Sequence, residues 1–199
     1  TRLVVADNTM RSCFAEGVAF ICFFPEPDGV AFSATILRNT IEESERGGLL
    51  FSCSLGPSQN RYRIIAADNT LRGNKQFGAS ILTAIPLAER VPQHNQVNAI
   101  LAGNAISASP IGILVQGAVG ETHHNRCEVT IDRNRISSCS KNAVRLVGGV
   151  GIEGIATQIN TLQAVVSRNF VAGSIPAVVA RGAGGAGTLQ HNAVQVRFF

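Results

Sequence analysis

A phrase of about 30 residues, written repeatedly along the chain, most constrains what this sequence can fold into. Its clearest copy spans residues 129–149 and holds three short apolar runs, with an Asn at the first bend. Periods of this length are typical of solenoids, in which one repeat buries its apolar face only by stacking on its neighbours. The matching Asn residues are Asn8, Asn39, Asn69, Asn104, Asn134, Asn169 and Asn192.

The residues around each Asn indicate that the seven positions are equivalent. An apolar residue stands three positions before each Asn and another stands two positions after it. The three runs of each copy alternate in apolar character, which is strand periodicity, and turn-type residues separate them. A small residue opens the last run in every copy but the truncated final one: Gly17, Gly48, Gly78, Gly112, Ala143 and Ala177.

Stacked copies of this phrase predict an all-β fold. Equivalent strands would pair about 4.8 Å apart, so we expect a right-handed parallel β-helix with three sheets and six to seven coils. Residues 1–199 would form one domain. The Asn side chains at the bend can donate to one coil and accept from the next, and we expect them to form a ladder. The alternative is a set of unrelated turn residues, because Asn suits turns.

On the Asn-x-apolar bend and the Gly- or Ala-led last strand, the chain resembles the pectin-lyase-like superfamily of right-handed parallel β-helices. The resemblance covers residues 3 to about 196. It implies the fold, and it favours an extracellular, cell-surface or particle-surface location. Activity on polysaccharides in that superfamily generally uses carboxylates, Arg or Lys on the sheet beside the long loops. The matching positions here carry no carboxylate, and Arg145 and Arg181 are their charged residues.

Composition limits the partners that the sequence predicts. The formal net charge is +4 and no cluster of Lys and Arg exceeds two adjacent positions, so we expect no nucleic-acid partner. No apolar run approaches the length of a membrane span. The five Cys residues are expected to be mainly buried thiols. Two G-x-G-x-x-G matches are interpreted as turn glycines, because no acidic residue follows Glu153 to bind a ribose. We expect no cofactor and no metal.

The longest connections all follow the last strand of a copy, so they should line one edge of the rod. The sheet that they border should present two outward rows that are largely apolar, and such a patch usually marks a contact surface. The alternative is that the chain's own loops cover it. The first row is Ala19, Leu50, Ser80, Leu114, Arg145 and Val179, and the second is Ile21, Ser52, Leu82, Gln116, Val147 and Arg181.

The best polar cluster falls on the same predicted edge, at residues 121–125 and in the preceding loop. Glu89, His94, Glu121, His123 and Arg145 are the candidate acid, base or charge-stabilising groups. Solvated loop histidines are the alternative interpretation. The candidate binding residues are Arg90, Gln116, His124 and Arg181.

These features favour a non-catalytic interaction or assembly module. Its apolar sheet face and loop-lined edge would meet a protein partner, a second copy of the chain or a glycan. The alternative is a polysaccharide-processing enzyme of the lyase, glycoside hydrolase or epimerase type, or a fragment of one. Glycoside hydrolysis needs two carboxyl groups roughly 5–10 Å apart. Loops of adjacent coils would have to supply that pair as Glu89 and Glu121.

Overall fold

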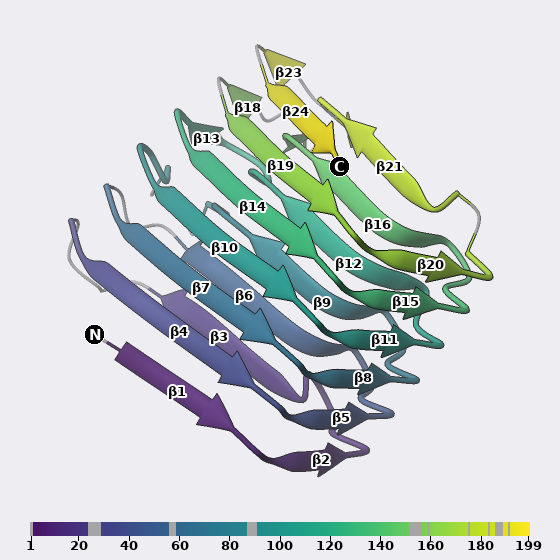
Figure 1. Cartoon of the computed structure of the whole chain (residues 1–199). Coiled ribbons are helices and arrows are strands. Elements are labelled where there is room, and N and C mark those ends of the chain that lie inside the picture. The colour runs from purple at the N-terminus through teal and green to yellow at the C-terminus, as the bar shows by residue number, and fades with distance from the viewer. Residues whose placement is uncertain are drawn as a thin grey trace.

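The computed structural model confirms the predicted fold class. It describes residues 2–23, 29–55, 59–86, 91–151, 157–158, 160–174, 176–182, 184–185, 189–190 and 192–199. These residues form strands and turns without any helix, and parallel strands stack coil upon coil into three long sheets (Figure 1). No described segment is a helix with the length and apolar character needed to cross a membrane.

Each of the first six coils contributes one strand to each of three sheets, called A, B and C here, and the last coil contributes a strand to sheet A alone. Sheet A holds β1 (Arg2–Ala6), β4 (Ala31–Leu37), β7 (Arg61–Ala67), β10 (Gln96–Ala102), β14 (Arg126–Asp132), β19 (Thr161–Ser167) and β24 (Ala193–Phe198). Sheet B holds β2 (Thr9–Arg11), β5 (Thr40–Glu42), β8 (Thr70–Arg72), β11 (Ala105–Ser107), β15 (Arg135–Ser137) and β20 (Phe170–Ala172). Sheet C holds β3 (Val18–Phe23), β6 (Gly47–Leu55), β9 (Phe77–Leu82), β12 (Ile111–Gln116), β16 (Asn142–Val147) and β21 (Val178–Arg181).

Two short sheets lie in the connections from sheet C back to sheet A. One contains β13 (Thr122–His123), β18 (Thr157–Gln158) and β23 (Leu189–Gln190), and the other contains β17 (Val150–Gly151) and β22 (Gly184–Gly185). The seven strands of sheet A and the six strands each of sheets B and C agree with the predicted number of coils.

The core forms because strand residues alternate between the interior and the surface while equivalent residues of successive coils lie in register. In sheet C, Phe51 pairs with Ile81, Ile81 with Val115, and Val115 with Leu146. All four side chains are fully buried. The interior column is therefore continuous from coil to coil, as the repeat predicted.

A ladder of Asn side chains follows sheet A, at the bend into sheet B. Each Nδ2 donates to the Oδ1 of the Asn in the next coil at 2.9–3.0 Å. The residue before each ladder Asn has a left-handed backbone, with φ between 51° and 65°. The predicted ladder is confirmed for Asn8, Asn39, Asn69, Asn104, Asn134 and Asn169.

The prediction for Asn192 was wrong, because this residue belongs to a second ladder at the bend that leads into sheet A. Asn160 Nδ2 donates to Asn192 Oδ1 at 3.0 Å. Asn192 directly precedes β24, just as Asn160 precedes β19, and these two strands pair. The apolar residues that flank Asn192 imitate those of the first ladder, although it lies only 23 residues beyond Asn169. The second ladder contains Asn60, Asn95, Asn125, Asn160 and Asn192.

Candidate functional site

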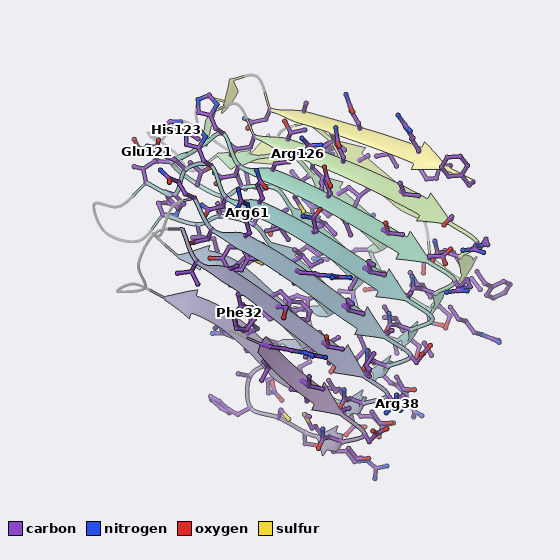
Figure 2. All side chains as sticks on the ribbon, turned by 60° about the vertical axis from the view of Figure 1, so that its left-hand side comes forward. Phe32, Arg38, Arg61, Glu121, His123 and Arg126 are labelled. Atoms are coloured by element: carbon purple, nitrogen blue, oxygen red, sulfur yellow. The ribbon has the colours of Figure 1, made fainter. Side chains whose placement is uncertain are left out.

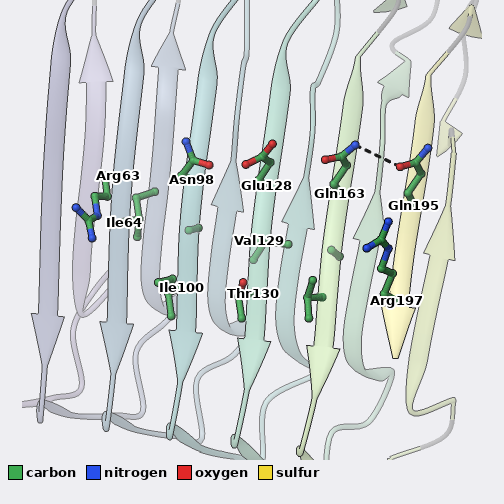
Figure 3. Close-up of a pocket in the computed structure, with 13 residues that line it drawn as sticks. Arg63, Ile64, Asn98, Ile100, Glu128, Val129, Thr130, Gln163, Gln195 and Arg197 are labelled. Atoms are coloured by element: carbon green, nitrogen blue, oxygen red, sulfur yellow. Dashed lines mark hydrogen bonds between the residues drawn. The ribbon is translucent and has the colours of Figure 1, made fainter. Parts of the chain in front are cut away.

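A groove of about 460 Å³ crosses the outer face of sheet A, from β7 to β24 (Figure 3). Two rows of outward side chains line it, because parallel pairing places equivalent residues side by side. The first row is Arg63, Asn98, Glu128, Gln163 and Gln195. The second row is Ile100, Thr130, Val165 and Arg197. The groove therefore combines a polar row with a partly aliphatic one.

Side-chain contacts hold the polar row in place. Arg126 forms an ion pair with Glu128 on its own strand. Its Nη2 also donates to Gln163 Oε1 at 3.2 Å, and Gln163 Nε2 donates to Gln195 Oε1 at 3.2 Å (Figure 3). These contacts join β14, β19 and β24, so the free donors and acceptors of the row have fixed positions.

Positive charge surrounds the single groove carboxylate of the described residues. Arg63 and Arg197 stand at opposite ends, four strand steps apart, which is about 19 Å. Among the ion pairs of the described residues, none involves either of them. Figure 2 shows Arg61 and Arg126 on this same face. The groove is thus electropositive at both ends and hydrogen-bonded in the middle.

The predicted loop-edge cluster is only partly brought together. The rings of His94 and His124 stack with centroids 5.0 Å apart and planes 3° from parallel. Both residues have left-handed backbones and directly precede a rung of the second ladder, Asn95 or Asn125. No described carboxylate pairs with either ring. The stack therefore lacks the third group that would orient an acid or base.

The remaining loop-edge candidates form no cluster among the described residues. Glu121 is exposed, and His123 is partly buried in β13, with its backbone paired to Gln93 of the preceding coil (Figure 2). Glu89 and Arg90 lie outside the described residues. The carboxyl pair required by the enzyme alternative therefore has one member, Glu121, within the described part of the chain.

The outward rows of sheet C are less exposed than the sequence suggested. Ser80, Ser52 and Val147 are buried at 1%, 4% and 1% exposure. Arg145 and Gln116 are partly buried, and Arg181 is exposed beside Val147 on the neighbouring strand. The strongly exposed large apolar residues of the described chain all lie elsewhere: Val4, Phe14, Ile100, Phe170, Phe198 and Phe199.

Neither a metal site nor a reactive thiol emerges from the described residues. No group of three His, Cys, Asp or Glu side chains gathers among them. Cys127 and Cys139 are buried free thiols, Cys53 is buried, and Cys13 is partly buried. Burial raises the pKa of Cys127 to about 12, so this thiol stays protonated at neutral pH.

The sequence interpretation missed the sheet A groove. Alternating polar residues on a strand resemble an ordinary solvated face, and each residue is unremarkable alone. The available signal was the column: Asn98, Glu128, Gln163 and Gln195 recur at one repeat position with amides or carboxylates throughout.

Comparisons with protein-family models, with curated proteins and with solved structures found no match. The structure therefore shows a parallel β-helix, and none of these comparisons supports the pectin-lyase-like assignment.

Proposed function

We propose that the protein is a non-catalytic β-helix binding module whose sheet A groove holds a linear glycan with acidic groups. The observation that carries the proposal is the polar row, in which Arg126 joins Glu128 to Gln163 and Gln163 bonds to Gln195. Arg63 and Arg197 stand at the two ends of the groove, and neither has an ion-pair partner among the described residues. The glycan would lie along the coil axis, across the strands.

The lining favours a ligand rich in hydroxyl groups. Amide side chains both donate and accept hydrogen bonds, as sugar hydroxyls do. The described groove residues include no aromatic side chain, whereas protein–protein interface cores are enriched in aromatics and depleted in charge. Asn98 and Gln195 supply amide groups and Thr130 supplies a hydroxyl group, on three different strands.

The charges favour acidic sugars. Arg63 and Arg197 end the groove, and Arg126 already neutralises Glu128. A guanidinium binds a carboxylate or sulfate through two parallel hydrogen bonds. A chain of uronic acids could therefore meet one arginine at each end and the amides between them.

The same lining supports binding rather than cleavage. Glu128 is the single carboxylate among the described residues of the groove, and glycoside hydrolysis uses two. Its carboxylate is also engaged in an ion pair with Arg126. Polysaccharide processing stays the alternative function.

The test is a double variant, Arg63→Gln with Arg197→Gln, titrated calorimetrically with oligogalacturonate and with a neutral glucan. We expect binding to the uronate to weaken at least about tenfold, because each lost arginine removes a charge-assisted contact. Arg72→Gln with Arg135→Gln removes the same charge from exposed positions of sheet B and should leave binding unchanged.

Equal weakening by the two pairs would mean that net charge, and not the groove, attracts the uronate. Absence of binding to every uronate polymer would overturn the proposal. The same incubations should release neither unsaturated nor reducing ends, and their appearance would establish the enzyme alternative instead.

A further inference from the structure

A second groove, of about 580 Å³, lies on the outer face of sheet C and has a different character. Its walls are largely apolar and come from β6, β9 and β12, whereas its rim is basic. The wall residues are Leu50, Phe77, Leu82, Ile111 and Leu114. It shares no lining residue with the sheet A groove.

Ser80 lies at the floor of this groove. It stands in register between Leu50 of one coil and Leu114 of the next, so a short side chain separates two long ones. Ser80 is 1% exposed, and its Oγ has no hydrogen-bond partner among the described residues. An unpaired buried hydroxyl destabilises a fold, and a third Leu would continue the row. Departures of this kind from good packing are expected at functional positions.

The rim offers one available cation. Arg46 Nη1 lies 4.0 Å from Glu16 Oε1, and Lys75 forms an ion pair with Glu45. Lys141, just before β16, is exposed and has no carboxylate partner within the described chain. An anionic group placed over the rim would find Lys141 without competition.

We infer that this groove binds a small aliphatic carboxylate. The alkyl chain packs against Leu50, Leu82 and Leu114 over the groove floor at Ser80, and the carboxylate pairs with Lys141. The volume falls within the roughly 300–1,000 Å³ of small-molecule sites. A broad protein contact is less favoured, because the strongly exposed large apolar side chains of the described residues lie outside sheet C. This inference is independent of the proposed glycan site.

The test uses decanoate, below its micelle concentration, with binding measured by calorimetry and by ligand-observed NMR. Ser80→Leu raises the groove floor with the residue that its row neighbours already carry. We expect it to weaken decanoate binding at least about tenfold, because the alkyl chain loses its buried contacts. Unchanged circular dichroism and an equal or higher melting temperature would show that the variant is folded.

Two further variants separate the parts of the site. Lys141→Ala should weaken decanoate about threefold, as expected for an exposed ion pair, and leave 1-decanol unaffected. Val4→Ser removes an exposed apolar side chain from β1 of sheet A, outside both grooves, and should change the binding of neither ligand.

Failure of the wild-type protein to bind decanoate would overturn the inference, as would equal binding by folded Ser80→Leu. Oligogalacturonate binding should be the same in Ser80→Leu and wild type. A protein that binds the uronate but not decanoate would retain the first site and lose only the second.

Discussion

Two consecutive residues shape the bend from sheet A to sheet B in each coil: a residue with a left-handed backbone and then a ladder Asn. Arg38, Asp68 and Arg133 carry side chains in a backbone region that costs them energy. The next residue in each case is a ladder Asn, whose backbone N–H and Nδ2 both donate to the Asn of the next coil. The hydrogen bonds of the ladder offset the strain of the bend.

Asn104 in the middle of the first ladder should therefore be costly to replace. Asn104→Ala removes the Oδ1 that accepts from Asn69 N and Nδ2, and the amide that donates to Ala66 O, in a buried column. We expect the free energy of unfolding in urea to fall by about 2–4 kcal/mol. Asn8→Ala, at the exposed end of the same ladder, should cost less than about 1 kcal/mol. Equal losses would mean that the ladder is not a source of stability.

Asp132 should make stability depend on acid pH. Arg168 donates to its carboxylate at 2.7 and 2.9 Å and Ser167 donates at 2.7 Å, and these contacts hold the pKa of Asp132 below its ordinary value. The depressed pKa contributes stability above about pH 4, which is lost as pH falls through the folded-state pKa. The melting temperature of Asp132→Asn should lie below that of wild type at pH 7, and the gap should close towards pH 2. A constant gap would exclude this role.

Residue patterns predicted one ladder and missed the other for a physical reason. Asn39 and Asn69 sit between two strands in contact with the core, so the apolar residues around them are fixed. Asn60 and Asn95 follow connections of different length and composition, which leave no common flanking residues in the sequence. Spacing was the only sequence signal for this second ladder. The apolar residues that flank Asn192 led to its assignment to the first ladder instead.

At the scale of elements, the strands of sheet C begin close to positions that require a small residue. A Cβ built on Gly112 at the start of β12 would lie 2.5 Å from Ala143 O and 2.6 Å from Ile136 Cγ2. The bend from sheet B thus brings two coils closer than a side chain allows.

Gly112→Ala should lower the free energy of unfolding by about 1–3 kcal/mol, because the methyl group overpacks the bend. Gly182→Ala is the matched control, since among the described residues its Cβ would meet one atom, Asn192 O, at 3.1 Å. The control should change the urea midpoint little. An unchanged urea midpoint in both variants would show that the bend relaxes to accommodate the methyl group.

The strand period predicted which side chains of sheet C point outward, but not how exposed they are. Ser80 and Val147 are buried because neighbouring coils bring larger side chains beside them. Burial of this kind depends on the register between coils, which one repeat read alone does not contain. The network from Arg126 to Gln195 escaped prediction for the same reason, because it joins three coils.

At the scale of the whole molecule, stability should vary along the axis. Strands β10 and β14 have a paired neighbour on both sides, whereas β1 and β24 are the edges of sheet A. In a linear stack each coil is stabilised by its neighbours, so the end coils open first. Amide hydrogen exchange measured by mass spectrometry should be slowest in β10 and β14 and fastest in β1 and β24. Uniform exchange along the rod would indicate a single all-or-none opening.

The two amide columns also have a polarity: from Asn8 to Asn169, and from Asn95 to Asn192, every side chain donates in the same direction. The chain could therefore be cut at one position of the repeat and rejoined at the equivalent position of another coil. Gene duplication or deletion that adds or removes one full turn would rejoin both columns without a mismatch. Such a rod can change its length during evolution while its cross-section stays constant.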